Sequence, residues 1–291
     1  MFHALQDHYD VVAIRQPWPK WFWLLRRAVR RLTGGVIDLY WSPAWTRLAS
    51  AGTLSEIRAH RPDVVMVVAI TPICALIAPS FVCVHVSDAT QALMANYNGA
   101  FRRLAAHVSR SAEALETTTL RESALTLFPL HWAHDSAIRD HGASPERAHV
   151  VPWGANFAAE EFPPQNTLET DECRLLFVGI NWFGKGGDIA LATLAELQRQ
   201  GRAVSLDIVG CAPPGPTQEI EGVRFHGFLS KANDADRAKL AELYRSARIF
   251  FLPTRYEAVG MVFAEAGSFG LPSVSYRTGG VPETVVNGET G

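Results

Sequence analysis

Short apolar runs alternate with helical patterns along the second half of the chain, and this alternation constrains the fold more than any other feature. The runs have the length of buried strands and stand at Leu175–Val178, Val204–Val209, Val223–His226, Ile249–Leu252 and Ser273–Tyr276. Helical periodicity extends over Asp188–Gln200, Ala238–Ser246 and Val262–Phe269. Strands and helices that alternate over short connections form a parallel sheet with helices on both faces. The sequence therefore predicts a protein of the α/β class.

The first half of the chain shows the same alternation less regularly. Apolar runs predict strands at Val11–Ile14, Val64–Ile70, Phe81–Val86 and Ala148–Pro152, and helical patterns cover Phe101–Leu115 and Trp132–His141. The segment 158–171 is acidic, contains two prolines and lacks periodicity, which is typical of a linker. We predict two Rossmann-like parallel-sheet domains, residues 1–157 and 172–291, facing each other across a cleft. Ligands of such sheets bind outside the carboxyl ends of the strands.

Both ends of the chain lack an element that such domains usually contain. Residues 1–8 resemble the tail of a helix that leads directly into the first predicted strand, and residues 286–291 end on turn residues without a closing helix. We expect the first strand of the first domain and the C-terminal end of the second domain to be missing.

Composition and charge exclude several classes of protein. With 291 residues, 48% of them hydrophobic and 19% charged, the chain is globular, and its net charge of −2 gives no basic surface for nucleic acid. The four cysteines have no paired spacing, and the N-terminus has no signal-peptide pattern, so we expect a cytoplasmic protein. The uncharged stretch Val64–Val86 is long enough to cross a membrane, but Pro72 and Pro79 divide it, which favours two buried strands around a short segment.

Three loops of the second domain follow strands and should converge on one edge of the sheet. The loop Gly179–Gly187 has glycines that allow close backbone approach and a lysine, Lys185, whose charge suits phosphate. The loop Thr278–Glu283 has two glycines and a proline at a helix start, which is typical of a strand-to-helix turn and also allows contact with an anion.

The loop that lies between these two along the chain, Arg255–Glu265, carries the most informative residues. Glu257 follows a strand, and Gly260 should open a helix whose first amides form an anion site. Glu265 lies in the second turn of that helix among apolar residues. It is either part of a solvated face or a buried acceptor for a pair of hydroxyls, such as those of a ribose.

The stretch Leu175–Gly291 resembles the nucleotide-sugar-binding domain of GT-B glycosyltransferases, in particular the retaining GT4 family. The resemblance rests on FVG with KGG, LDIVG, VRFHGFL, the segment from LAELY through RYEAVGMVFAEAG, and TGGVPETVVNGETG. Glu257 and Glu265 stand at the spacing of the family's E-x7-E motif.

The resemblance implies a role for each matching residue. Lys185 would neutralise the donor diphosphate, and the backbone of Gly260, Met261 and Val262 would hold phosphate or sugar oxygens, with Gly179 among the donor-binding residues. Glu265 would bind the ribose hydroxyls, and Glu257 the hydroxyls of the transferred sugar.

Two positions depart from the family pattern. The usual phosphate-binding arginine is here Ile180, and Arg255 is a candidate to replace it. The family's histidine near the sugar corresponds to Ser87, followed by Asp88, while His85 lies inside the predicted strand. Asp88 is therefore the candidate catalytic residue of the first domain, beside Lys185 and Glu257 in the second.

The activity that the resemblance implies is transfer, with retention, of a sugar from a nucleotide-diphosphate sugar to a hydroxyl acceptor: a glycan, a lipid-linked compound or a small molecule. We expect no metal and no cofactor other than the donor substrate. Two alternatives stay open: a non-catalytic or truncated nucleotide-sugar-binding remnant, and a GT-B sugar-nucleotide epimerase.

Three other patterns have a structural interpretation that we favour. Asp234 and Asp236 form a DxD sequence before a helix, where an N-cap role is expected. Three histidines (His131, His134 and His141) fall on one predicted helix, without the cysteine or paired carboxylate that a metal site would add.

The Trp21–Leu32 segment has tryptophan and leucine on one side of a predicted helix and arginines on the other. This pattern suits peripheral contact with an anionic membrane. It also suits a surface helix that packs its apolar side on its own domain, which is the interpretation that we favour.

Overall fold

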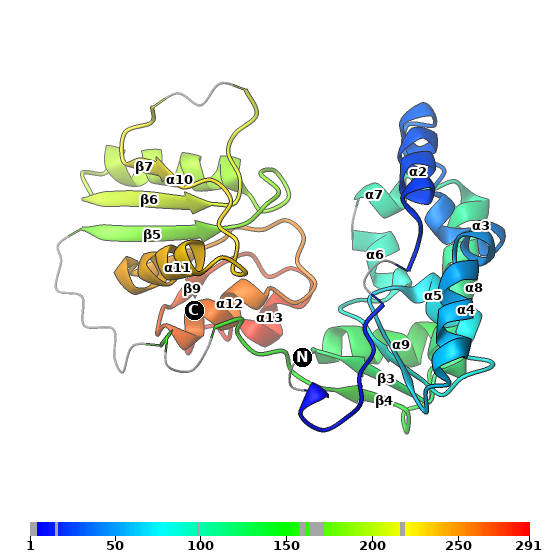
Figure 1. Ribbon diagram of the computed structural model, residues 1–291. Coiled ribbons are helices and arrows are strands. Elements are labelled where there is room, and N and C mark those ends of the chain that lie inside the picture. Colours follow the sequence, from blue (N-terminus) through cyan, green and yellow to red (C-terminus); the bar gives the residue numbers. More distant parts are fainter. Residues whose placement is uncertain (1–4, 15–16, 98, 158–160, 163–171, 216–218) are drawn as a thin grey trace. The chain divides into compact units, whose positions relative to one another are not determined.

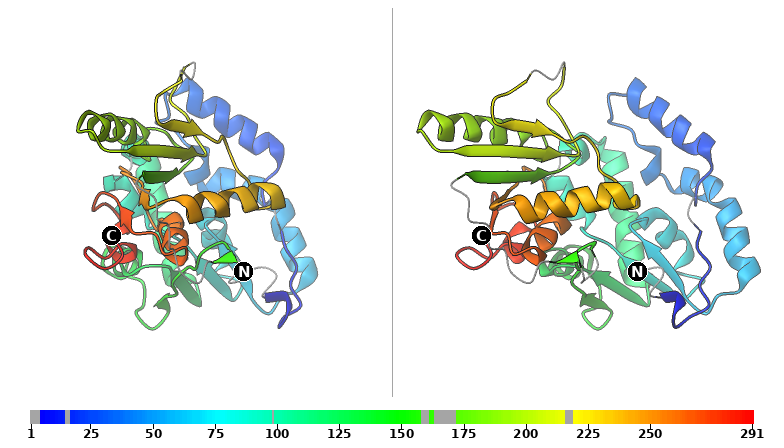
Figure 2. Two further views of the ribbon diagram at one scale, coloured as in Figure 1. Left: turned by 90° about the vertical axis from the view of Figure 1, so that its left-hand side faces the viewer. Right: turned by 60° about the vertical axis from the view of Figure 1, so that its left-hand side comes forward.

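The chain forms two compact units in the computed structural model, which describes residues 5–14, 17–97, 99–157, 161–162, 172–215 and 219–291 (Figure 1). Unit 1 comprises Met1–Phe128 and Ala133–Val150, and unit 2 comprises Pro129–Trp132 and Val151–Gly291. Each unit has its own parallel sheet with helices packed around it (Figure 2). The predicted linker, residues 158–171, lies almost entirely outside the described residues.

Unit 1 is built on a four-stranded parallel sheet in the order β1-β2-β3-β4. These strands are β1 (Val65–Val68), β2 (Cys83–Val86), β3 (Leu125–Phe128) and β4 (Ala148–Val150). Its helical elements are α2 (Lys20–Leu32), η1 (Leu39–Trp41), α3 (Pro43–Ala49), α4 (Ala51–His60), α5 (Thr71–Ile77), α6 (Gln91–Tyr97), α7 (Gly99–Arg102), α8 (Ala106–Glu122) and α9 (His131–His141). Helices α5 and α8 pack against each other and against β2.

Unit 2 is built on a five-stranded parallel sheet in the order β7-β6-β5-β8-β9. The strands are β5 (Cys173–Val178), β6 (Val204–Val209), β7 (Val223–Phe225), β8 (Ile249–Phe251) and β9 (Ser273–Val274). The helices are α10 (Gly187–Arg199), α11 (Asp234–Ser246), α12 (Met261–Ser268) and α13 (Val281–Thr284). Each predicted strand and helix of this half is present, with bounds that differ from the predicted ones by four residues or fewer.

One charged residue lies inside the buried strand β6. Asp207 is 2% exposed and accepts hydrogen bonds from Arg224 at 2.8 Å and His226 at 2.6 Å, both from β7 or directly after it. Burial pushes the pKa of Asp207 up, but the hydrogen bonds from Arg224 and His226 outweigh it and hold the pKa below its ordinary value. The pairing explains why a strand with a carboxylate can sit in the core.

The predictions for unit 1 need three corrections. Val11–Ile14 is not a strand: its Val12 is 52% exposed, and no sheet partner for it lies in the described residues. Strand β3 was not predicted, because Thr126 interrupts its apolar run, yet Thr126 is 1% exposed between two neighbouring strands. The predicted helix Phe101–Leu115 is two helices, α7 and α8, since Ala105 has a non-helical backbone (φ −58°, ψ 146°) and is the N-cap of α8.

The uncharged stretch Val64–Val86 forms β1, α5 and β2, as its prolines indicate. Strand β2 is largely buried, whereas Met66 and Val68 of β1 are exposed, because β1 stands at the end of the strand order. Within the described part of the chain, no helix is long and apolar enough to span a bilayer.

Gly186 is the tightest point of the loop after β5, and it yields a stability prediction. It has φ +78°, and a Cβ placed on it would lie 2.0 Å from the Pro253 carbonyl oxygen. Gly201 has nearly the same φ, +75°, but open space around it. We expect Gly201→Ala to cost about 1–2 kcal/mol of unfolding free energy through backbone strain alone, and Gly186→Ala to cost about 2 kcal/mol more through the clash.

Urea denaturation of both variants measures this difference. Equal losses of unfolding free energy in the two variants would contradict the close packing of Gly186 on Pro253.

Candidate functional site

Three loops of unit 2 meet at the carboxyl edge of its sheet, as the sequence predicts. The amide of Arg255, in the loop after β8, donates to the Gly184 carbonyl in the loop after β5 (2.8 Å). The amide of Gly280, in the loop after β9, donates to the Glu257 carbonyl (3.2 Å). Backbone hydrogen bonds therefore fix all three loops to one another.

Lys185 and Glu257, two of the predicted donor-binding residues, form an ion pair across these loops. The Lys185 Nζ lies 2.5 Å from the Glu257 Oε2, and the side chains are 22% and 12% exposed. A Cβ on Gly179 would lie 2.8 Å from the Lys185 Cγ, so the lysine stem crosses directly over that glycine. The site thus presents a cation and a carboxylate side by side, both reachable from solvent.

The start of helix α12 adjoins this pair. Gly260 is its N-cap with φ +69°, and a Cβ there would meet the Glu257 Cγ at 3.1 Å. The amides of Met261 and Val262 belong to the first turn of the helix, where backbone N–H groups have no intrahelical acceptor. Together with the helix dipole they favour an anion beside Lys185.

Glu265 is a buried acceptor and not part of a solvated face. It is 0% exposed on α12, its Oε1 accepts from the Lys231 Nζ, and its Oε2 accepts from the Tyr244 hydroxyl at 3.1 Å. The Lys231 Nζ also lies 5.2 Å from the centre of the Phe157 ring. Sequence reasoning missed Lys231 and Tyr244, because neither belongs to a motif and only the fold brings them to Glu265.

Arg255, the candidate to replace the arginine that the chain lacks at Ile180, is paired with Asp188 in this structure. Ile180 is 73% exposed, while Arg255 donates to both carboxylate oxygens of Asp188 at 2.8 Å and to the Phe183 carbonyl. The hydrogen bonds from Arg255 lower the pKa of Asp188, so the two charges are committed to each other.

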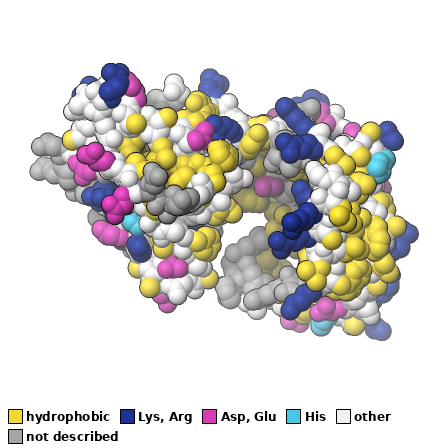
Figure 3. Space-filling model, turned by 90° about the horizontal axis from the view of Figure 1, so that it is seen from above, with side chains coloured by type: hydrophobic (Ala, Val, Ile, Leu, Met, Phe, Trp, Pro, Cys, Tyr) yellow, Lys and Arg dark blue, Asp and Glu magenta, His cyan; other side chains and the backbone are white. Residues whose placement is uncertain are grey.

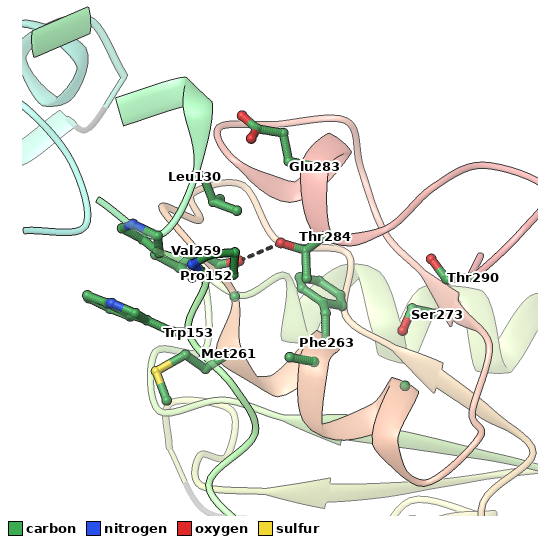
Figure 4. A pocket seen from close by; sticks show the side chains of 14 residues that line it. Leu130, Pro152, Trp153, Val259, Met261, Phe263, Ser273, Glu283, Thr284 and Thr290 are labelled. Atoms are coloured by element: carbon green, nitrogen blue, oxygen red, sulfur yellow. Dashed lines mark hydrogen bonds between the residues drawn. The ribbon is translucent and has the colours of Figure 1, made fainter. Parts of the chain in front are cut away.

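A cavity of about 270 Å³ lies within unit 2 behind this edge (Figure 4). Trp153, Val259, Met261 and Phe263 line its apolar part, and Gly260 also borders it. The cavity therefore reaches the start of α12. Sequence analysis gave no signal for it, because its wall combines segments that are far apart in the chain.

Glu283, from the third loop, has a structural role in unit 2. Its carboxylate accepts from the backbone amides of His131 (2.7 Å) and Trp132 (2.6 Å), at the start of α9. A carboxylate at a helix N-terminus is stabilised by the free amides and by the dipole.

Asp88, the candidate catalytic residue of unit 1, follows β2 with its side chain exposed. Ser87 is buried and donates to the Ala89 carbonyl at 2.9 Å. His85 is fully buried inside β2, and burial lowers its pKa to about 4, so the imidazole is neutral and closed to substrate. Of these three side chains, that of Asp88 is the exposed one.

Glu116 lies in the interior of unit 1, close enough to Asp88 to sense its charge. Burial raises the pKa of Glu116 to about 8, against a hydrogen bond from Thr71, and the charge of Asp88 raises it further. The Glu116 carboxyl is therefore largely protonated at neutral pH.

Two sequence interpretations of polar patterns change in detail. The N-cap of α11 is Asn233, whose side chain accepts from the Asp236 amide, so neither aspartate of the DxD sequence is the cap. His131 and His134 do share α9, but Asp135 and not His141 is their neighbour, with ligand atoms within 4.8 Å of one another. His141 is buried and contacts Thr117.

Comparisons with known proteins agree with this geometry. Residues 172–291 match the family model described as Glycosyl transferases group 1. The D-inositol 3-phosphate glycosyltransferase of Acidothermus cellulolyticus is 31% identical over 180 residues, which are 55% of this chain and 40% of that protein. The glycogen synthase of Mycobacterium tuberculosis is 30% identical over 189 residues, 63% of this chain and 45% of that protein. The chain thus spans less than half the length of these curated relatives.

Solved structures show the same fold. Sucrose-phosphate synthase from Thermosynechococcus elongatus aligns with a TM-score of 0.67 and 18% identity, over 87% of this chain and 65% of that one. The predicted GT-B class, with two parallel-sheet α/β domains, is confirmed, and the C-terminal part of the chain is a group 1 glycosyl transferase domain.

Glu116 gives unit 1 a specific pH dependence. Its folded pKa of about 8 is raised above the ordinary 4.5, so its contribution to stability is complete below pH 4.5 and is lost as the pH rises through 8. Between these values one proton released on unfolding lowers the unfolding free energy by at most about 1.4 kcal/mol per pH unit. We expect Glu116→Gln to remove this slope in denaturation experiments at several pH values.

Glu113→Gln is the matched control, because Glu113 is exposed on the same helix. A pH dependence of stability that is the same in the wild type and in Glu116→Gln would contradict the assignment.

Proposed function

We propose that this chain, whose residues 172–291 form a Glycosyl transferases group 1 domain, transfers a sugar from a nucleotide-diphosphate sugar to a hydroxyl acceptor. The observation that carries the proposal is the Lys185–Glu257 pair beside the start of α12. A cation and helix-end amides lie there next to a carboxylate, and these groups suit phosphate and sugar hydroxyls.

Each residue would have a separate task in this reaction. Lys185 and the amides of Met261 and Val262 would bind the diphosphate and stabilise the charge that develops as it leaves. When Lys185 turns to the phosphate, Glu257 would be released to accept hydrogen bonds from the sugar. Glu265 would accept from the ribose hydroxyls, with Lys231 giving way to them.

The chemistry that we propose needs no metal and no cofactor besides the donor. The cationic side chain and the helix amides would supply the charge stabilisation that a divalent ion otherwise gives a departing diphosphate. Transfer with retention follows from the resemblance to the GT4 family, with the acceptor hydroxyl attacking from the face that the nucleotide leaves. Asp88 of unit 1 is the candidate to contact the acceptor or the transferred sugar from that unit.

Ile180 favours a second candidate function, a nucleotide-sugar-binding remnant. With an exposed isoleucine where the family has an arginine, and Arg255 bound to Asp188, the diphosphate would have one cation fewer. Such a protein would bind donors without consuming them.

Removal of either charge from the pair tests the proposal. We expect Lys185→Ala and Glu257→Gln each to lower turnover by about a hundredfold or more, because each removes a group that stabilises the departing diphosphate or the sugar. The measurement is release of nucleoside diphosphate from UDP-, GDP- and ADP-glucose with a panel of hydroxyl acceptors.

Lys239→Ala and Glu242→Gln serve as controls, since both residues are exposed on α11. Undiminished turnover in both site variants would refute the proposal, while donor binding without turnover in the wild type would favour the remnant.

A further inference from the structure

Helix α2 is anchored to unit 1 by one face. Phe22 is 0% exposed and packs on Trp18, with the ring centres 5.0 Å apart. Arg26 donates to both carboxylate oxygens of Asp38 (2.6 and 2.8 Å), and Arg30 donates to the same carboxylate at 2.9 Å. Because Asp38 is 4% exposed, these contacts fix the rotation of the helix about its axis.

The tryptophan and leucine side of α2 faces outward, contrary to the interpretation that the sequence favours. Trp21 is 45% exposed, Leu24 68% and Leu32 86%, and Ala28 between them is also exposed. These residues follow at spacings of three and four and so form one stripe. The side that packs on the domain carries Phe22 instead.

Cations run beside the exposed stripe. The sequence of α2 contains five basic residues and no acidic one. Arg26 and Arg30 are held by Asp38, whereas Lys20, Arg27 and Arg31 form no ion pair with any residue in the described ranges. With Leu24 they follow at spacings of four, three and four, so they lie in a second stripe that shares Leu24 with the first. Figure 3 looks onto the end of unit 1 where α2 lies and shows hydrophobic and basic side chains side by side there.

We infer that this face of α2 binds the surface of a bilayer that contains anionic lipids. Trp21, Leu24 and Leu32 would enter the headgroup region, where tryptophan is favoured, and the cations would bind lipid phosphates. The charges suit this partner, because an acidic surface compensates cations that have no ion-pair partner among the described residues. A second copy of the chain is a less suitable partner for this face of α2, since two such faces would bring like charges together without an acidic residue between them.

The contact is peripheral and independent of the proposed glycosyl transfer. Arg26 and Arg30 stay on Asp38, so the helix binds as it is folded and needs no rearrangement. The interaction should weaken with salt, since it depends on exposed cations. Membrane binding also requires both stripes of α2. The cations attract the helix to the anionic lipids, and the apolar side chains bury their surface in the headgroup region.

Sedimentation of the full chain with lipid vesicles tests the inference. We expect binding to vesicles of phosphatidylcholine with about one third phosphatidylglycerol, loss of binding at high salt, and little binding to pure phosphatidylcholine. Arg27→Ala with Arg31→Ala should lower the partition coefficient roughly thirtyfold, at about one kcal/mol per basic residue. Leu24→Ser with Leu32→Ser should lower it at least as much.

Matched controls come from α3 and α4 of the same unit. Arg47→Ala with Arg58→Ala removes two exposed arginines, and Leu48→Ser removes a leucine that is 59% exposed, without touching α2. Circular dichroism melting shows that each variant is folded. Brominated lipid should quench tryptophan fluorescence in the wild type and less so in Trp21→Phe, which keeps an aromatic ring.

Three results would overturn the inference: no binding of the wild type to the anionic vesicles, equal binding of the α2 variants and the controls, or equal binding to both kinds of vesicle. If the wild type associates with itself and does not bind vesicles, and Leu24→Ser with Leu32→Ser abolishes the self-association, the face binds a second copy of the chain. Nucleotide binding is measured separately, so failure of this inference leaves the proposed function untouched.

Discussion

Charge balance at the carboxyl edge of the unit 2 sheet is the constraint on which its site depends. Glu265 is fully buried there and the side chain of Glu257 is 12% exposed, and an unpaired buried carboxylate costs several kcal/mol. Each has a lysine: Lys185 for Glu257 and Lys231 for Glu265. The lysines come from loops after β5 and β7, and the glutamates come from the segment that follows β8, so the pairs also join loops that are distant in sequence.

The same pairing explains why a nucleotide-diphosphate sugar suits this edge. A ligand that brought only negative charge would take the lysines and leave two carboxylates uncompensated. A ligand that brought only hydroxyls would offer nothing to the lysines. A nucleoside diphosphate joined to a sugar carries both, so phosphate can replace a carboxylate at Lys185 while hydroxyls satisfy Glu257 and Glu265. This exchange gives Lys185, Glu257 and Glu265 new partners, while Lys231, which is 28% exposed, would turn to water, and it supports the proposed donor class.

The sequence predicts unit 2 far better than unit 1, for a physical reason. Buried parallel strands such as β8 appear as continuous apolar runs, and the loops after them carry their functional residues in order. In unit 1, Thr126 interrupts the apolar run of β3. The apolar run Val11–Ile14 pairs with no strand in the described part of the chain. Residues that only the fold brings together have no sequence signal. Lys231 and Tyr244, which donate hydrogen bonds to Glu265, are examples. The orientation of α2 also has no sequence signal, because it is fixed by Asp38, a residue outside the helix.

Hydrogen exchange of backbone amides, with and without nucleotides, tests the central claim most directly. The account predicts that one of UDP, GDP or ADP, or its sugar, slows exchange in peptides that cover Gly260–Phe263 and Gly179–Gly187, and that exchange in α2 stays unchanged. This protection should occur without added metal. If none of the nucleotides slows exchange at the start of α12 in the folded protein, the edge of unit 2 is not a donor site and the account is wrong.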